Sequence, residues 1–289
     1  MKKEDISKNS VGVTNVFRSF ALYMNALFPF LLPLKNYING RVFRGIIMYF
    51  KDYASYVEQD RKIQSGFAIK WRNNFPILTE RYEAAGSVPR HYFWQDLWAA
   101  KKVYKSKVPR HYDVGSRLDG FIAHCLPFCD VVMLDIRPLQ EKIKNLSFIQ
   151  VNCTDMSTIL SDSLESFSSL HAVEHFGLGR YGDPIDPIGY KKAIMEIQRV
   201  VKPKGDIYFS VPVGVERLEF NAHRIFYPQT VLALFNQCDI LDFSVVDDEN
   251  IFHEKVDPSH FTELKYGCGL FHFQKRSILK TVDSSPRKT

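Results

Sequence analysis

The sequence predicts an α/β fold with a parallel β-sheet, preceded by a helical N-terminal extension. From residue 109 onward, short apolar runs of strand length alternate with longer amphipathic stretches, as in a parallel sheet covered by helices on both faces. Residues 110–121 combine a short strand-like run, a turn that contains Gly115 and the beginning of a helix. The next apolar run ends in an acid, Asp135, and ligands of such folds bind at the carboxyl ends of the strands.

The length and composition are those of a folded globular protein. The 289 residues suffice for one large α/β domain plus an extension. An apolar fraction of 45% and a charged fraction of 24% are enough for a sizeable core. We therefore expect a helical extension over 1–90, the α/β domain over 91–280 and a disordered polar tail over 281–289.

The extension is basic. Residues 1–110 contain 19 Lys and Arg against 8 Asp and Glu, whereas residues 111–289 contain 19 against 24. Two explanations stay open, namely a solvated helical surface or attraction to an anionic partner such as a membrane surface, a lipid-linked glycan or a nucleotide sugar. The basic residues are spread and no nucleic-acid-binding signature is present, so we expect no nucleic acid as a partner.

We expect a cytoplasmic protein, and peripheral membrane contact through the extension stays open. Residues 16–34 are apolar but contain Arg18 and two prolines, whereas a spanning helix needs about 20 cleaner residues, so a buried or interfacial helix is expected instead. The first residues lack the apolar core of a signal peptide. Five scattered cysteines without metal or redox spacing favour reduced thiols. Nothing in the sequence sets the oligomeric state.

Each element has its own signal. Residues 15–105 are expected to be helical, with a break near Pro89 and an amphipathic helix over 92–100 whose aromatic residues suit the core or a pocket lid. Beyond them, apolar runs predict strands and the amphipathic stretches predict helices, one of which ends at Lys202–Gly205. The predicted strands are 110–114, 131–135, 147–151, a run ending near Leu170, 206–212, 239–246 and 267–275, and the predicted helices are 119–127, 188–202 and 228–236.

The turn at Gly115 and the acid Asp135 indicate an adenosine-containing cofactor. Asp135 lies 20 residues past Gly115, where an acid can reach the ribose hydroxyls of a ligand bound across the turn. The fingerprint G-x-G-x-x-G is absent, and Arg117 and Asp119 stand where it needs glycines. An arginine there suits a ligand with a carboxylate, such as the amino-acid end of S-adenosylmethionine. A nicotinamide-dependent sugar enzyme is therefore disfavoured.

Five segments in order resemble the motifs of the class I S-adenosylmethionine-dependent methyltransferase superfamily. They are the turn 113–115, the acid Asp135 and the segments 153–156, 168–175 and 199–205. The resemblance implies a Rossmann-like seven-stranded methyltransferase sheet that binds S-adenosylmethionine. The turn departs from the family's Asp-x-Gly-x-Gly-x-Gly at the later glycines, with Gly120 displaced by one. The cofactor-binding residues that the resemblance implies are Asp113, Gly115, Ser116, Arg117, Gly120, Asp135, Ile136, Asp155 and Met156.

More narrowly, residues 90–275 are similar to one poorly characterised family within that superfamily. The segments that carry this resemblance are HYFWQDLWAAK, DVGSRLDGF, LDIRPL, SLHAVEHFGLGRYGDPIDP and FNAHRIF. Bacterial members are associated with surface-polysaccharide loci. The resemblance therefore implies a sugar, a surface glycan or its precursor as the methyl acceptor.

The segment 171–175 is the candidate catalytic centre. Its pattern H-x-x-E-H also occurs in inverted zinc proteases, but there it lies on a helix, and here it follows a predicted strand and precedes two glycines. Some methyltransferases of the superfamily hold a divalent metal with a similar segment plus a later histidine, a place that His223 suits. Without a metal, a histidine would act as the base and Glu174 would orient it. Metal use stays open, and the catalytic candidates are His171, Glu174, His175 and His223.

The loop 177–187 is the candidate substrate segment. It is rich in glycine and proline and follows the fourth predicted strand, at the edge of the sheet that faces the substrate. It either grips sugar hydroxyls or only shapes the pocket wall. The candidate substrate-binding residues are Arg180, Tyr181, Asp183, Asp186 and, from the segment 220–226, Arg224.

Together these features favour a methyltransferase that O-methylates a sugar or surface glycan with S-adenosylmethionine. The alternative is a protein that binds this cofactor without catalysis, as a scaffold or regulatory partner in glycan assembly. The altered glycine turn favours the alternative slightly, and the histidine-rich segment argues against it.

Overall fold

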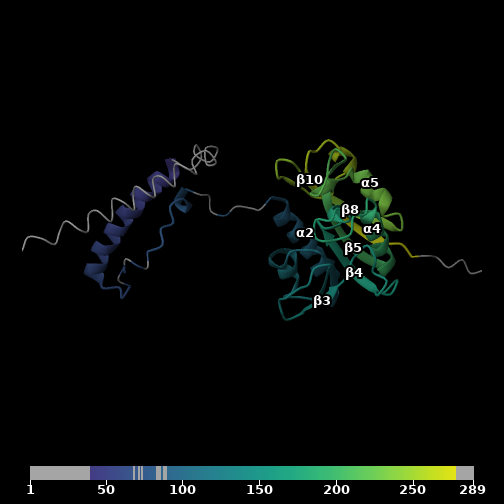
Figure 1. Ribbon diagram of the computed structural model, residues 1–289, viewed down its shortest axis with the longest axis horizontal. Helices are drawn as coiled ribbons and strands as arrows, with labels where there is room; N and C mark the ends of the chain where they lie inside the picture. The colour runs from purple at the N-terminus through teal and green to yellow at the C-terminus, as the bar shows by residue number, and fades with distance from the viewer. Residues whose placement is uncertain are drawn as a thin grey trace, which may run out of the picture. The chain divides into compact units, whose positions relative to one another are not determined.

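Figure 1 shows the computed structural model of the chain, which describes residues 40–67, 69–70, 72, 74–82, 86 and 90–277. The chain forms two compact units, Met1–Ser87 and Val88–Thr289. The sequence predicts this division after residue 90. The helix expected within 16–34 and the disordered tail expected over 281–289 lie outside the described residues.

The described part of the first unit is mainly helical. Residues 40–63 form one helix, and η2 (Glu80–Tyr82) is a short 3-10 turn. Asp52 on the long helix accepts a hydrogen bond from Arg81 at 2.5 Å, and Tyr56 donates to the carbonyl of Phe67 at 3.1 Å. Among the residues that the structure describes, no helix combines the length and apolar character needed to cross a membrane.

The second unit contains a sheet of eight strands in the order β3-β2-β1-β4-β5-β10-β8-β9. The first five strands of this order are parallel to one another, whereas β10 runs antiparallel to β5 and β8. The chain order reverses between β1 and β4, and ligands of open α/β sheets bind in the crevice at such a point. The strands are β1 (Arg110–Val114), β2 (Asp130–Asp135), β3 (Leu146–Gln150), β4 (Leu164–Leu170), β5 (Val201–Val213), β8 (Cys238–Val246), β9 (Phe252–His253) and β10 (Gly267–Lys275).

This arrangement confirms the predicted Rossmann-like α/β sheet. The seven predicted strands are present, but β5 begins at Val201 rather than at 206, because Val201 already pairs with Leu164 ahead of a shift in register. The preceding helix therefore ends at Val200 instead of 202. The edge strand β9 and the hairpin of β6 (Arg217–Glu219) and β7 (His223–Ile225) were not predicted. Strands of two or three residues are too short to show alternation of apolar and polar residues.

Helices cover both faces of the sheet (Figure 1). On one face lies α2, together with the turn that follows β1, and on the other lie α4 and α5. The helix predicted over 119–127 is instead a π-turn followed by a short α-helix, because Gly120 has non-helical angles of φ −116° and ψ −115°. The helical elements are α2 (Arg90–Ser106), η3 (Leu118–Ile122), α3 (Ala123–Cys125), η4 (Val173–His175), α4 (Gly189–Val200), α5 (Pro228–Leu234) and η5 (Pro258–Phe261).

Two buried apolar clusters fill the space between the sheet and the helices. Strand β10 contributes to both, because its side chains alternate between the faces of the sheet. Leu270 lies in the cluster that contains Trp98 of α2, whereas Phe271 lies in the cluster that contains Ile194 of α4. A strand covered on both faces needs apolar residues at nearly every position, which the run Gly267–Phe273 supplies.

Replacing Phe271 by alanine is expected to lower the free energy of unfolding by about 3–5 kcal/mol, because the fully buried ring would leave a cavity. Its ring centroid lies 4.8 Å from that of Phe243 and 5.8 Å from that of Phe273. The matched control is Leu241→Ala on the neighbouring strand β8, where the side chain is 51% exposed, with an expected change of about 0.5 kcal/mol. Urea unfolding of both variants measures the difference, and equal losses would contradict the packing described.

Candidate functional site

Two adjoining cavities open at the carboxyl ends of the parallel strands. The first cavity has a volume of about 290 Å³ and is bounded by the ends of β1, β2 and β3 and by the loop that follows η4. The second cavity, of about 720 Å³, is bounded by α2, the end of β4 and the β6–β7 hairpin. Residues shared by both linings are Gly115, Arg137, His171, His175 and Tyr181. The switch point of the sheet therefore carries a two-part site.

The turn after β1 separates the two cavities. Gly115 has a φ of +74°, and a Cβ added there would lie 3.1 Å from the Cβ of Ala172, so glycine meets both a conformational and a spatial need. The next residue, Ser116, donates to Asp113 from its N–H at 3.0 Å and from its hydroxyl at 2.8 Å. Asp113 is fully buried and lines neither cavity, so it holds the turn from below.

Asp113 is the end of a buried polar chain. Ser168 of β4 donates to its carboxylate, and the same hydroxyl lies 2.8 Å from Nε2 of His111. The other ring nitrogen of His111 lies 2.7 Å from the hydroxyl of Ser166. Burial raises the pKa of Asp113 to about 6 and lowers the pKa of His111 to about 3. The strands β1 and β4 on either side of the switch point are therefore tied to the Gly115 turn by buried side-chain hydrogen bonds.

Asp135 lies in the first cavity with its carboxylate already engaged. Arg137 contacts it through Nε at 3.0 Å and Nη2 at 2.7 Å, and the backbone N–H of Arg137 donates to it at 2.9 Å. The guanidinium of Arg137 also lies 4.5 Å from the ring centroid of Tyr181. Ile136 lines the same cavity. A ligand that binds Asp135 therefore meets a carboxylate that already accepts hydrogen bonds from Arg137.

Several residues expected at the cofactor lie elsewhere. Met156 is fully buried in the core, and Asp155 accepts from the N–H of Ser157 at 3.1 Å and lines neither cavity. Instead, the three residues before Asp155 line the first cavity. Gly120 packs directly against the Asp96 carboxylate, so its lack of a side chain serves that contact. Arg117 lines the second cavity, where it pairs with Asp119 at 2.7 Å.

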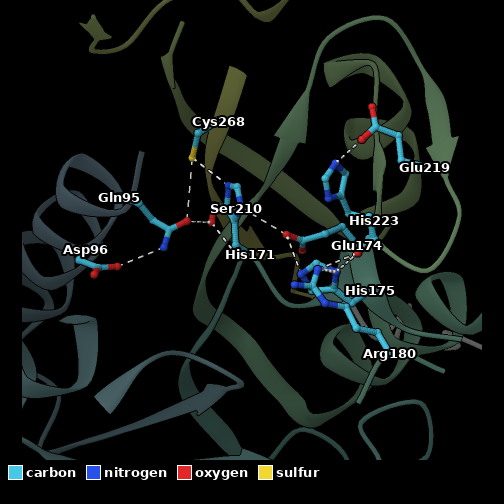
Figure 2. A network of polar contacts seen from close by, with 11 residues as sticks. Gln95, Asp96, His171, Glu174, His175, Arg180, Ser210, Glu219, His223 and Cys268 are labelled. Carbon is cyan, nitrogen blue, oxygen red and sulfur yellow. Dashed lines mark hydrogen bonds and ion pairs between the residues drawn. The ribbon is translucent and has the colours of Figure 1, made fainter. Parts of the chain in front are cut away.

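Two of the catalytic candidates, His171 and His175, flank the buried carboxyl group of a third, Glu174 (Figure 2). The chain leaves β4 through His171, which has a φ of +50°, and enters the 3-10 turn η4. Oε1 of Glu174 lies 3.3 Å from Nδ1 of His171 and 3.6 Å from Nε2 of His175. Glu174 is 1% exposed, and its other oxygen has no hydrogen-bond partner among the described residues. All these residues line the second cavity.

The shortest contact of His175 indicates its tautomer, since Nδ1 lies closer to the carbonyl of Ala222 than to Nη1 of Arg180, at 3.4 Å. Nδ1 lies 2.6 Å from the carbonyl oxygen of Ala222, which can only accept, so Nδ1 carries the proton. Nε2 is therefore the unprotonated nitrogen. Burial lowers the pKa of His175 to about 4 and that of His171 to about 3, and it raises the pKa of Glu174 to about 8. At neutral pH this wall of the cavity is uncharged and His175 can accept a proton.

His223 belongs to the same cavity but to another pair. Its Nε2 lies 3.1 Å from Oε2 of Glu219, and its ring centroid lies 6.3 Å from that of His175. The four catalytic candidates therefore do not converge on one point as a metal site would require. Across the described ranges, the one group of three or more metal-ligating side chains with all ligand atoms within 4.8 Å is His91, His171 and Cys268.

The candidate substrate residues divide into three groups. Arg180 and Tyr181 line the second cavity, and Arg180 donates to the carbonyl of Ala222 at 2.9 Å. Asp183 and Asp186 line the first cavity instead; the former accepts from the N–H of Gly177 and the latter pairs with Lys192, both at 2.7 Å.

Arg224 lines neither cavity. Its buried guanidinium donates to the carbonyl oxygens of Phe176 at 2.7 Å, Glu174 at 3.3 Å and Pro187 at 3.4 Å. These bonds use the guanidinium to hold the backbone around Glu174 and the following loop. Contact between Arg224 and the substrate stays a prediction, and the guanidinium already has these backbone partners.

Sequence reasoning allowed the aromatic residues of α2 a place in the core or in a pocket lid but missed the polar residues that α2 contributes to the second cavity. Tyr92, Gln95 and Asp96 line it, and the available signal was a pair of polar residues on the apolar face of an amphipathic helix. Gln95 accepts from the hydroxyl of Ser210 at 2.6 Å and donates to Asp96 at 3.1 Å, as Figure 2 shows. With these residues, α2 adds to the polar lining of the second cavity, which includes both Glu174 and Asp96.

Comparison with known proteins gives a family model and a fold likeness. Residues 128–261, less than half of the chain, match the model described as Caenorhabditis protein of unknown function, DUF268. No curated protein matches the chain. Among solved structures, the chain is similar to 1,6-didemethyltoxoflavin-N1-methyltransferase of Burkholderia thailandensis, crystallised with 1,6-didemethyltoxoflavin and S-adenosylhomocysteine, at 13% identity over 78% of this chain and 87% of that chain, with a TM-score of 0.48.

Two further structures show similar likeness. The N-methyltransferase NodS of Bradyrhizobium japonicum, in complex with S-adenosylhomocysteine, is 12% identical over 64% of this chain and 86% of that chain, with a TM-score of 0.44. The (4+2)-cyclase SpnF is 14% identical over 64% of this chain and 81% of that chain, with a TM-score of 0.48. At such identities the likeness concerns the fold alone.

The stability of Asp113→Asn relative to wild type is expected to depend on pH. The folded-state pKa of Asp113, about 6, lies above its ordinary value of 3.8, so its contribution to stability is complete below pH 3.8 and is lost as the pH rises through 6. Asparagine does not ionise, so the variant should gain about 3 kcal/mol relative to wild type between pH 4 and 8. Urea unfolding across this range measures the gain. A difference that stays constant with pH would show that Asp113 is ionised throughout.

Proposed function

We propose that the protein is an S-adenosylmethionine-dependent methyltransferase that binds the cofactor in the first cavity and the methyl acceptor in the second. The proposal rests on one observation, that the two cavities meet across the Gly115 turn at the switch point of the sheet. The first cavity contains Asp135 at the end of β2. The second contains the buried carboxyl group of Glu174 between two imidazoles. Cofactors of such sheets bind at this point.

The residues of the first cavity suit an adenosine moiety. Asp135 offers two carboxylate oxygens to a pair of ribose hydroxyls, in exchange for the guanidinium of Arg137. Ile136 and Cys153 provide apolar contact for a base, and Asn152 and Thr154 provide polar groups at its edge. The amino-acid end of the cofactor would pass the Gly115 turn toward Arg117. This assignment replaces Asp155 and Met156 by the residues that precede them.

His175 is the proposed base. S-adenosylmethionine supplies an electrophilic methyl group and leaves as a neutral thioether. The acceptor oxygen bonds to that methyl group as its own proton passes to Nε2 of His175, whose Nδ1–H stays bonded to Ala222. Protonated Glu174 can donate to His171, or in its ionised form stabilise the imidazolium of His175, so it tunes the base rather than touching the acceptor.

The second cavity suits a polar acceptor, and we propose a sugar or a glycan precursor. Its lining offers phenol, amide, guanidinium and imidazole groups from Tyr92, Asn221, Arg180, His223 and Tyr266. Such groups bind hydroxyls through hydrogen bonds, and aromatic rings pack against sugar faces. In the same proposal the protein acts in the cytoplasm in polysaccharide biosynthesis, and the basic segment 1–110 contacts an anionic membrane surface or lipid-linked glycan.

Cofactor binding tests the first half of the proposal. Calorimetric titration of the full chain with S-adenosylmethionine and S-adenosylhomocysteine is expected to show micromolar binding. Asp135→Asn should weaken binding about 10–100-fold, because hydrogen bonds to a charged group contribute about 1.5–3 kcal/mol. The matched control is Asp130→Asn at the exposed start of the same strand, which should bind as wild type does. Absence of binding in wild type, or equal binding by Asp135→Asn, would contradict the cofactor site.

Acceptor turnover tests the second half. With a panel of sugars and nucleotide sugars, S-adenosylhomocysteine formation is expected to fall about 10²–10⁴-fold in His175→Ala while cofactor affinity is kept. His260→Ala, an exposed change on η5, is the control and should keep full activity. If wild type binds the cofactor but methylates nothing in the panel, the scaffold alternative gains support; if His175→Ala turns over as fast as wild type, His175 is not the base.

A further inference from the structure

A second polar cluster lies behind the wall that His171 contributes to the second cavity. Nε2 of His171, which points away from Glu174, lies 3.2 Å from Sγ of Cys268 on β10. The ring of His91, from the first turn of α2, has its centroid 6.1 Å from that of His171. Each of the three residues offers a ligand atom, and these atoms lie within 4.8 Å of one another. Three elements far apart in sequence thus converge on one point.

We propose that His91, His171 and Cys268 bind a transition-metal ion of the zinc class beside the second cavity. Two imidazoles and a thiolate are the donors that Zn²⁺, Co²⁺ and Cu⁺ prefer, and they disfavour Mg²⁺ and Ca²⁺, which take oxygen ligands. The proposal is independent of methyl transfer, because metal binding can be measured without cofactor or acceptor.

Glu174 provides a second observation that points to a metal. A metal-bound histidine almost always gives its other ring N–H to a carboxylate or carbonyl, which fixes the ring and increases the basicity of the ligand nitrogen. His171 is placed for this arrangement, since Nε2 faces Cys268 and Nδ1 lies 3.3 Å from Oε1 of Glu174, as Figure 2 shows. With a metal on Nε2, the Nδ1–H would face an ionised Glu174. The carboxyl group is 1% exposed, and its second oxygen lacks a partner among the described residues. A cation bound to His171 would place a positive charge close to this buried carboxyl group.

The other two ligands are held in place by their surroundings. The His91 ring stacks on the ring of Tyr266, with 5.4 Å between centroids and 22° between planes. Cys268 is fully buried in the interior of β10, where Gly267 pairs with Val213 and Cys268 with Pro212. His171 and Cys268 are already in contact at 3.2 Å, and all three ligand atoms lie within 4.8 Å of one another.

The chemistry of binding is defined. The dication displaces the thiol proton of Cys268, which passes to solvent, while both imidazoles bind as neutral ligands. Three protein ligands leave one tetrahedral position open, the pattern of catalytic rather than structural zinc sites. The cluster lies behind the wall of the second cavity, and neither His91 nor Cys268 lines that cavity, so water is the ligand expected in the open position.

Metal titration of the full chain tests the proposal. Chelator-treated protein is expected to bind one equivalent of Zn²⁺ in competition with a chromophoric chelator, and Co²⁺ should give the thiolate-to-cobalt charge-transfer band. Cys268→Ser should abolish that band, and His91→Ala should weaken Zn²⁺ binding at least about tenfold. Glu174→Gln should weaken it about 10–100-fold while keeping the band. The matched control is Cys238→Ser, which changes another buried cysteine, at the start of β8. This variant should bind metal as wild type does.

The outcomes separate cleanly. Absence of stoichiometric Zn²⁺ binding by wild type overturns the proposal, as does a cobalt band that survives Cys268→Ser or a Zn²⁺ affinity that survives His91→Ala. If Cys268→Ser fails to fold, as judged by circular dichroism, the half-buried His91→Ala variant decides. If the protein binds S-adenosylhomocysteine but no metal, the metal site is contradicted and the methyltransferase proposal is unaffected. If it binds metal but no cofactor, the methyltransferase proposal is contradicted and the metal site is supported.

Discussion

The carboxyl group of Glu174 sets the constraint on which the candidate site depends. It is 1% exposed and lies between the imidazoles of His171 and His175, and an ionised carboxylate buried without a partner is strongly destabilising. Contacts from several sides hold the backbone around Glu174 in place. His171 adopts a positive φ of +50°, and Arg224 donates to the carbonyls of Glu174 and Phe176. One wall of the second cavity thus contains a carboxyl group, that of Glu174, which can exchange a proton and which backbone contacts hold in place.

A second buried acid organises the other side of the switch point. Asp113 accepts from Ser116 in the glycine turn and from Ser168 in β4, and β4 ends next to His171. The strand β1 pairs with β4 in a fixed register. A slip of one residue would turn these side chains to the opposite face of the sheet and break the series of hydrogen bonds from His111 to Ser116. The turn of the first cavity and the wall of the second therefore keep a fixed relation to each other.

The sequence predicted the sheet well because its signals are local. A strand covered on both faces is a continuous apolar run, so the bounds of β10 are those predicted, and a turn that needs a positive φ shows as Gly115. The path of the chain after β3 is not a local property. Met156 enters the core, where its N–H meets Glu196 at 2.7 Å, so the lining of the first cavity passes to Asn152 and its two successors. Cofactor contact by any of these residues stays a prediction.

The sequence does not show which polar side chains are already used in contacts within the fold. An arginine among histidines and aromatic residues indicates a ligand contact, yet three carbonyl oxygens occupy the guanidinium of Arg224, and backbone N–H groups occupy Asp183. One partner of His171, Cys268, lies 97 residues away in the sequence, beyond the reach of any local pattern. A polar residue in a candidate segment can serve a ligand only if the fold leaves a donor or acceptor open. His175 meets that condition, because its Nδ1 bonds to the carbonyl of Ala222 and leaves Nε2 without a hydrogen bond within the described structure, which is why we propose it as the base.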